Sequence, residues 1–394
     1  MDPLTALLNL PAAKKNEDGI EYTPREIAQQ PETWLRTCAL VRRREGEIRE
    51  FLASCGIRGP VAERPVVLLV GAGSSDYIGR CLAQLLRSRW QCEVFPIAST
   101  TLLPDLPDFV LPDRRYLWIS ISRSGDSSEG VATLERAVAE YPRVSHLLLT
   151  CNPAGRMTRA IEGRANCLPI VLDESTNDRG LAMTSSFSNL LLAGQLVAHA
   201  GNMAEFEATV HTLARAGEDL LPKAASLASS LAQEGLSRAF FVGSGALAGA
   251  ATESSLKLLE LTAGKVQAMA QSTLGLRHGP MAALHPETAL VSFVSSRPQQ
   301  RKYDLDLLRE IGRKGLVRRR VAVAASAPEE LRGEAEYVLA PATADAIPDS
   351  CRPVLDVIFA QLLGLFSSMQ LGLKPDLPSP NGAISRVVQN VGIH

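Results

Sequence analysis

The chain of 394 residues is 46% hydrophobic and has a formal net charge of −1. This composition is typical of a soluble globular protein long enough for two domains, and the near-neutral charge argues against a nucleic-acid partner. The only dense basic runs, 42–44 and 318–320, are short enough to be solvated helix faces or strand edges. No stretch reaches the ~18 uninterrupted apolar residues of a membrane helix, and residues 1–15 lack the order of a signal peptide. We therefore expect a cytoplasmic protein with no membrane partner.

The cysteines and histidines show no spacing that predicts a metal site. The cysteines are odd in number and scattered, and the six histidines lack HxxxH or HxH pairs. We therefore expect reduced thiols, no disulfide framework, and neither a metal nor another cofactor. The seven cysteines are Cys38, Cys55, Cys81, Cys92, Cys151, Cys167 and Cys351.

Residues 1–60 are expected to form a polar, helical arm. Within "YTPREIAQQPETW", Thr23 is expected to cap a helix, with Pro24 at its first position and Glu26 at its third. Further along, 190–232 is expected to form long helices joined near Gly201. After Gly372 the chain is Pro-rich and apolar, which favours a tail packed over another part of the protein.

The middle of the chain contains the same order of features twice. Each copy has a strand-like run, a glycine-rich turn, a helical segment and further apolar runs separated by helical segments. The expected strands of the first copy are 65–70, 93–97, 116–121, 146–150 and 167–172, and those of the second are 238–242, 266–269, 288–294, 321–324 and 337–340. Apolar strands that alternate with helices predict an α/β fold of two doubly wound, five-stranded parallel sheets. Ligands of such sheets bind at the carboxyl ends of the strands.

The two glycine-rich turns, "GAGSSD" and "GSGALAG", resemble a dinucleotide-binding fingerprint. The first has Asp76 where a small residue is needed, and neither is followed by a ribose-binding acid about 20 residues on. A nicotinamide or flavin enzyme therefore remains only a third alternative. Purely structural turns need only the glycines, so the added Ser74 and Ser75 favour ligand contact in the first copy.

The stretch "SISRSGDSSE" follows the apolar strand-like run 116–121 directly. Ser122, Ser124 and Ser127 surround Gly125, which allows a tight turn with exposed N–H groups where a helix should begin. An ordinary helix cap needs only one hydroxyl. A second hydroxyl-rich loop, "AMTSSFSN", contains Ser185. These loops predict a phosphate site, whereas a P-loop NTPase is disfavoured because no GxxxxGK[ST] occurs.

These residues resemble those of the sugar isomerase (SIS) domain family. "SRSGDS" is similar to the family's SxSGx[ST] phosphate loop, although the position of Ser127 is often Thr and that of Asp126 an amide or acid. Two tandem copies resemble the isomerase half of glutamine:fructose-6-phosphate amidotransferase. A closer resemblance is to the AgaS group of galactosamine-6-phosphate deaminase/isomerases, also described as tagatose-6-phosphate ketose/aldose isomerases. The shared motifs are "YTPREIAQQP", "DRGLAMTSSFSN", "ESSLKLLELTAG", "LRHGP" and "NGAISRVVQNV".

The resemblance implies catalytic roles for a few residues. Glu253, Lys257 and Glu260 lie at i, i+4 and i+7 and share one helix face. A solvated Glu253–Lys257 pair is the alternative, whereas Glu260 matches the family's base, which carries a proton between C1 and C2. His278 in "LRHGP" matches the histidine that opens the sugar ring and that reaches a neighbouring subunit's site. Arg386 falls near a tail lysine that closes the site in the amidotransferases, but only a lysine could form an imine.

The resemblance also implies a phosphate-binding set and a domain organisation. The phosphate-binding set is Ser74, Ser75, Ser122, Arg123, Ser124, Gly125, Ser127 and Ser185, with Glu253 supporting the catalytic residues. The expected parts are a helical arm (1–60), a first SIS domain (61–200), connecting helices (201–232), a second SIS domain (233–371) and a tail over the active site (372–394).

We therefore expect an enzyme that binds a sugar phosphate and converts galactosamine 6-phosphate to tagatose 6-phosphate and ammonia. Glucosamine 6-phosphate as the substrate, simple isomerisation of a neutral sugar, and a non-catalytic phosphosugar sensor are the alternatives. A homodimer or a higher homo-oligomer follows if His278 serves a neighbouring subunit. A sensor is expected to have a DNA-binding segment, which 1–60 lacks.

Overall fold

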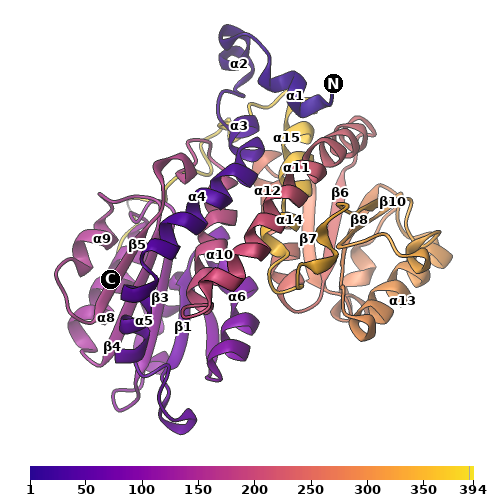
Figure 1. The fold of residues 1–394 in the computed structure, drawn as a ribbon. Helices are drawn as coiled ribbons and strands as arrows, with labels where there is room; N and C mark the ends of the chain where they lie inside the picture. The colour runs from indigo at the N-terminus through magenta and orange to yellow at the C-terminus, as the bar shows by residue number, and fades with distance from the viewer. Residues whose placement is uncertain (390) are drawn as a thin grey trace. The chain divides into compact units, whose positions relative to one another are not determined.

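Two five-stranded parallel sheets form the framework of the protein in a computed structural model that describes residues 1–389 and 391–394 (Figure 1). The first sheet has the order β2-β1-β3-β4-β5 and the second β10-β9-β8-β6-β7. The strands of the first sheet are β1 (Val66–Gly71), β2 (Val94–Ala98), β3 (Tyr116–Ser122), β4 (Val144–Thr150) and β5 (Cys167–Val171). Those of the second are β6 (Arg238–Gly243), β7 (Gln267–Ser272), β8 (Thr288–Val294), β9 (Arg319–Ala324) and β10 (Tyr337–Leu339). The expected fold class is confirmed.

Helices cover these sheets and precede the first of them. The arm contains α1 (Pro3–Leu8), α2 (Ala12–Asp18), α3 (Thr23–Ala28), α4 (Gln30–Arg43) and α5 (Glu45–Ser54). The next helices in the chain are α6 (Ser74–Trp90), α7 (Ser99–Phe109), α8 (Ser128–Glu140), α9 (Arg156–Ile161) and α10 (Ser185–Ala198). The remaining ones are α11 (Met203–Gln233), α12 (Ala246–Leu261), α13 (Pro298–Lys314), α14 (Pro353–Asp356) and α15 (Ile358–Gln370).

The chain divides into two units, which are described separately. Unit 1 comprises 1–32, 178–184 and 211–385 and contains the second sheet; unit 2 comprises 33–177, 185–210 and 386–394 and contains the first. Every residue of the central strands β1, β3 and β8 is buried, because both faces of these sheets are covered. Asn390, which belongs to the tail motif, lies outside the described residues.

The glycine-rich turns have the same geometry in both units. A Cβ on Gly71 or on Gly243 would lie 2.5 Å from the main chain of the helix that follows. Gly73 and Gly245 begin these helices with φ of 55° and 61°, a region that favours glycine. The glycines therefore satisfy a steric requirement of both turns, and the serines of the first turn are additional to it.

The expected cap of the arm helix is wrong. Thr23 is the first residue of α3 and makes no side-chain cap; its N–H and hydroxyl donate to Asp376 at 2.8 and 2.7 Å. Glu26 accepts the N–H of Arg179 at 2.6 Å and also that of Gly180. Burial, together with nearby carboxylates, raises the pKa of Glu26 to about 8. Partners distant in the chain have replaced the local cap.

The helical segment Pro353–Gln370 is the one described stretch long and apolar enough to span a membrane, and 89% of it is buried, as in a core helix of a soluble protein.

All seven cysteines are free thiols. Burial raises the pKa of Cys38, Cys92 and Cys167 to about 11.

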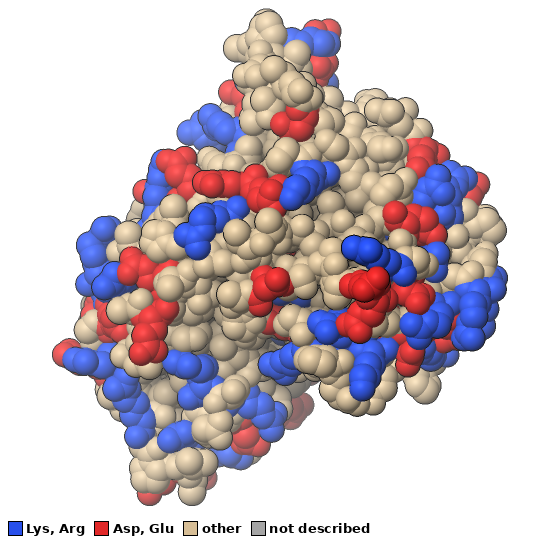
Figure 2. All heavy atoms as spheres, turned by 45° about the vertical axis from the view of Figure 1, so that its right-hand side comes forward, with Lys and Arg blue, Asp and Glu red and all other residues tan. Residues whose placement is uncertain are grey.

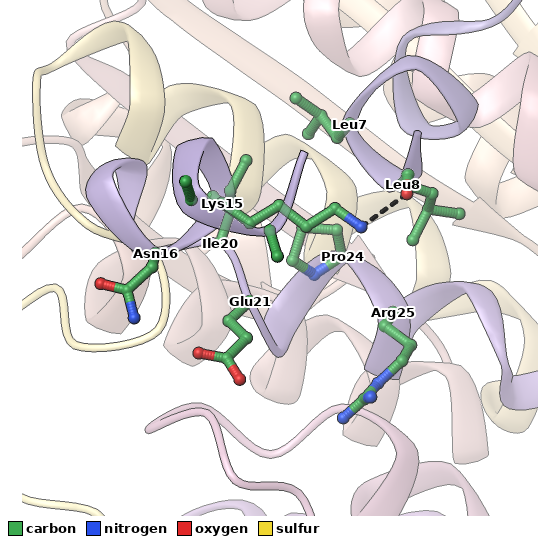
Figure 3. A pocket seen from close by; sticks show the side chains of 10 residues that line it. Leu7, Leu8, Lys15, Asn16, Ile20, Glu21, Pro24 and Arg25 are labelled. Carbon is green, nitrogen blue, oxygen red and sulfur yellow. Dashed lines mark hydrogen bonds between the residues drawn. The ribbon is translucent and has the colours of Figure 1, made fainter. Parts of the chain in front are cut away.

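Charged side chains of both signs are interspersed over the face shown in Figure 2. The basic runs form ion pairs: Arg44 with Glu47, Arg319 with Glu234 and Arg320 with Glu336. A pocket of about 700 Å³ lies in the arm between α1, α2 and α3 (Figure 3). Its Lys15 Nζ donates to Leu8 O at 2.6 Å, and none of the expected site residues lines it.

Candidate functional site

The serine loop of unit 2 joins β3 to α8. Gly125 has φ of 65°, and its N–H donates to Ser122 Oγ at 2.9 Å. Ser124 Oγ accepts the N–H of Asp126 at 3.2 Å. Ser127 is the N-cap residue of α8, but its hydroxyl does not cap the helix. Two serines therefore shape the turn, and the Ser127 hydroxyl lies at the helix N-terminus, where an anion is favoured.

The other expected phosphate ligands of unit 2 lie at the starts of helices. Ser74 and Ser75 are buried in the first turn of α6, after β1, which pairs directly with β3. Their turn and the serine loop therefore follow neighbouring strand ends. Ser185 is the first residue of α10 and is fully buried; α10 packs against α6.

The tail lies against the serine loop. Arg123 Nη2 donates to the carbonyl oxygen of Arg386 at 2.5 Å, and the N–H of Ser128 donates to Val388 O at 3.2 Å. The guanidinium of Arg386 donates to Asn177 Oδ1 at 2.8 Å. The structure therefore brings Arg386 next to the serine loop, and its side chain binds the tail to Asn177.

Sequence reasoning missed two asparagines at this site. Asn152 follows β4 and donates from Nδ2 to Ser124 O at 2.7 Å, so it holds the serine loop from the next strand. Its position just beyond a strand's carboxyl end was a usable signal. Asn177 had no comparable signal, because its partner Arg386 is distant in the chain.

In unit 1, a charged face of α12 carries the expected catalytic residues. Lys257 Nζ lies 3.4 Å from Glu253 Oε1 and 2.5 Å from Glu260 Oε2. Lys257 and Glu253 are fully buried, whereas the side chain of Glu260 is 23% exposed. The alternative of a solvated Glu253–Lys257 pair is therefore wrong. An ammonium at such depth requires compensating charge, which the two carboxylates provide.

Helix α12 ends at Leu261, one residue after Glu260. Ala263 and Gly264 have φ of 50° and 74°, and their N–H groups donate to Glu260 O and Leu259 O at 3.1 and 2.9 Å. This left-handed cap satisfies the last carbonyls of α12. Glu260 is thus held in the final turn, where its carboxylate reaches solvent.

His278 lies exposed on a loop of unit 1 whose neighbours are fixed. It separates the short helices η3 (Gly275–Arg277) and η4 (Pro280–Ala283). Leu276 is buried, and Arg277 Nε donates to Glu310 at 2.7 Å. The imidazole is therefore presented to solvent from a constrained turn.

Within the described ranges 1–389 and 391–394, no group of three His, Cys, Asp or Glu side chains is placed to hold a metal ion. The groups that are present suit two kinds of chemistry. The serine loop supplies hydroxyl groups at a helix N-terminus for an oxyanion, and α12 supplies a carboxylate beside a buried ammonium for proton transfer.

The fold and these residues define the class of protein: a double-domain phosphosugar isomerase of the SIS fold. No family model matches the chain. The tagatose-6-phosphate ketose/aldose isomerase of Escherichia coli superimposes with a TM-score of 0.85, at 32% identity over 94% of this chain and 96% of that one.

Two curated relatives narrow the class. AgaS of Streptomyces coelicolor is 37% identical over 380 residues, 96% of each chain. The D-galactosamine-6-phosphate deaminase AgaS of Escherichia coli O157:H7 is 34% identical over 381 residues, 95% of each chain. The chain belongs to the AgaS family.

Proposed function

We propose that this enzyme converts galactosamine 6-phosphate and water to tagatose 6-phosphate and ammonia. The named relatives are a galactosamine-6-phosphate deaminase and a tagatose-6-phosphate ketose/aldose isomerase. Proton transfer between C1 and C2 is a step that both reactions need. The sensor and glucosamine alternatives are not favoured by these relatives. The observation that carries the proposal is the partly exposed Glu260 carboxylate beside the buried Lys257 ammonium.

In the proposed reaction, His278 moves the ring-oxygen and hydroxyl protons that open the sugar ring. Glu260 removes the proton from C2 and returns it to C1, which converts the aldehyde and amine to a C1 alcohol and a C2 ketimine. Water adds to C2, and the C2–N bond breaks with release of ammonia. Lys257, paired with Glu253, places its ammonium in direct contact with the Glu260 carboxylate.

The substrate phosphate is proposed to bind at the hydroxyls and N–H groups of unit 2, with Arg386 in the tail. The set comprises Ser74, Ser75, Ser122, Arg123, Ser124, Gly125, Ser127 and Ser185. Its support is the pair of adjacent hydroxyl-rich turns after β1 and β3. The tail contact with Arg123 supports a role for Arg386 in holding that site rather than in imine formation.

We also propose a cytoplasmic homodimer in which His278 completes the site of the partner subunit. An apolar edge of unit 1 supports this: Met269 on the edge strand β7 and Leu274 beyond it are each 46% exposed, and Leu259 on the adjoining α12 is 40% exposed.

The proposed domain borders are those expected from the sequence: 1–60, 61–200, 201–232, 233–371 and 372–394.

The test is ammonia release from galactosamine 6-phosphate and from glucosamine 6-phosphate, with tagatose 6-phosphate isomerisation followed in parallel. Glu260→Gln keeps the shape of the side chain but removes the base, so turnover should fall by a factor of about 10² or more. Glu205→Gln, on an exposed position of α11, is the matched control and should keep full activity.

Ammonia from galactosamine 6-phosphate alone would establish the deaminase and its epimer preference. Ammonia mainly from glucosamine 6-phosphate would reassign the substrate. Binding of all three sugars without turnover would contradict an enzyme and support a sensor.

A further inference from the structure

The segment after β8 in unit 1 occupies the same place in its sheet as the serine loop in unit 2. Val70, which immediately precedes the first glycine turn, lies opposite Ser120 in the β1–β3 pair. Val242, which precedes the second turn, lies opposite Ser292 in the β6–β8 pair. The two central strands are therefore in the same register relative to their glycine turns, and the residues beyond them can be matched by counting.

Counting from this matched pair places Ser296 of unit 1 at the position of Ser124 in the serine loop. Ser296 is already bound to an anion of the chain itself. Its N–H and hydroxyl both donate to Asp349 Oδ1, at 2.9 and 2.7 Å. The Ser295 hydroxyl, which also lies 3.1 Å from Gln300 Oε1, donates to Asp349 Oδ2. The Asp349 carboxylate therefore lies at the position in unit 1 that corresponds, by strand register, to the expected oxyanion position at the serine loop of unit 2.

A buried arginine completes the binding of this carboxylate. Arg352 is fully buried, and its Nη1 lies 3.3 Å from Asp349 Oδ1. The same guanidinium donates to Val294 O at 2.7 Å and to Val323 O at 3.2 Å, at the ends of β8 and β9. It is thus fixed at the carboxyl edge of the sheet, where ligands of doubly wound folds bind.

The charges around Asp349 favour an anion at this position. Burial by itself would raise the pKa of Asp349, but hydrogen bonds from Ser295 and Ser296 and the Arg352 charge lower it. Asp356, the second carboxylate paired with Arg352, at 2.8 Å, has its pKa raised by burial to about 6. The serine donors and Arg352 therefore stabilise the charged form of Asp349.

We propose that unit 1 retains an oxyanion-binding site equivalent to the serine loop and that the Asp349 carboxylate is its built-in ligand. Each chain then offers one site to a phosphosugar, although it has two copies of the fold. This inference about unit 1 rests on the proposed function, in which the serine loop of unit 2 binds the substrate phosphate. The ligand class for the unit 1 site is a tetrahedral oxyanion, admitted once the carboxylate is removed.

The experiment measures the Tm of Asp349→Gly in chloride, formate and inorganic phosphate at constant ionic strength. Glycine opens the site, whereas Asp349→Asn fills it with a neutral side chain of the same shape. Asp113→Gly, whose side chain is fully exposed, is the matched control for general salt effects. In the wild-type protein Asp349 occupies the unit 1 site, so a rise in its Tm with phosphate reports binding at the serine loop alone.

Asp349→Gly should melt well below wild type in chloride, because Arg352 and the serine donors lose their ligand. Phosphate should raise its Tm by about 4 °C more than that of wild type, Asp113→Gly or Asp349→Asn. Recovery with formate but not with phosphate would make Asp349 an ordinary structural carboxylate and overturn the proposal. Equal phosphate shifts in all four proteins would overturn it as well.

Two further outcomes are assigned in advance. If Asp349→Gly does not fold in chloride, it is refolded from urea in chloride and in phosphate; recovery only in phosphate supports the proposal, and recovery in neither, with Asp349→Asn folded, contradicts it. A wild type without any phosphate shift would count against the serine loop as the phosphate site. The excess shift of Asp349→Gly over wild type would still decide the unit 1 site.

Discussion

Lys257 and Glu260 are in direct contact on α12, with 2.5 Å between Nζ and Oε2, and they differ sharply in burial. The ammonium is fully enclosed, whereas the carboxylate reaches solvent. The position of Lys257 is fixed from behind by the buried Glu253, 3.4 Å away. The buried Lys257 ammonium thus holds in place a Glu260 carboxylate that is accessible to a substrate.

Replacing Lys257 by Met should destabilise the protein by about 3–5 kcal/mol, because Glu253 would remain buried without its ammonium. Urea unfolding measures this loss, and ammonia release should fall as well. The double variant Lys257→Met/Glu253→Gln removes both charges and should regain most of the stability but no activity. A single variant as stable as wild type would show that the pair is not a charge-compensated unit.

Truncation of Arg386 to Ala should lower kcat/KM by about tenfold, mainly through KM, because the tail loses its bond to Asn177. Asn177→Ala removes the same bond from the other side and should have a similar effect. The double variant should then be no worse than either single variant. Additive losses in this cycle would show that the two residues act separately.

The twin turns offer a matched comparison. Gly71→Ala and Gly243→Ala each force a Cβ to within 2.5 Å of the following helix and should cost about 1–3 kcal/mol. Only Gly71→Ala displaces the helix start that contains Ser74 and Ser75, so it alone should weaken stabilisation by inorganic phosphate. Thermal melts with and without phosphate measure both effects, and equal phosphate responses would argue against Ser74 and Ser75 as ligands.

His146 should make the protein sensitive to acid. It is buried on β4 beside Trp118, and among the described residues neither of its ring nitrogens has a hydrogen-bond partner. Burial, with a smaller contribution from Arg164, lowers its pKa to about 4, against 6.5 when unfolded. Between these values the unfolded chain binds the extra proton, so stability is full above pH 6.5 and falls towards pH 4, by at most about 3 kcal/mol.

The check is urea unfolding of wild type and His146→Leu from pH 4 to pH 7. The leucine variant should show a flatter dependence on pH over this range. The same slope in both proteins would assign the acid sensitivity to other groups.

The sheets could be predicted from the sequence because their strands are continuous apolar runs. The run at 288–294 coincides with β8, and the neighbouring run at 321–324 misses only the first two residues of β9, both arginines. Solvated charges at the start of a strand interrupt the apolar pattern without interrupting the hydrogen bonding.

The polar contacts could be predicted only where they are local. Glu253, Lys257 and Glu260 lie on one helix, so helical geometry placed them together. The cap of α3 failed because its acceptor, Asp376, belongs to the far end of the chain. Asp349 escaped prediction for the same reason: nothing near it in the sequence indicates a bond to Ser296.

Because each unit contains at least one buried cysteine, the native thiols can report local unfolding of each unit separately. Cys351 belongs to unit 1, whereas the other six cysteines belong to unit 2. Cys81 and Cys351, both buried, can react with an alkylating reagent only when the structure around them opens. Labelling rates at Cys81 and Cys351, read peptide by peptide in a mass spectrometer, therefore give the opening equilibrium of each unit without an introduced probe.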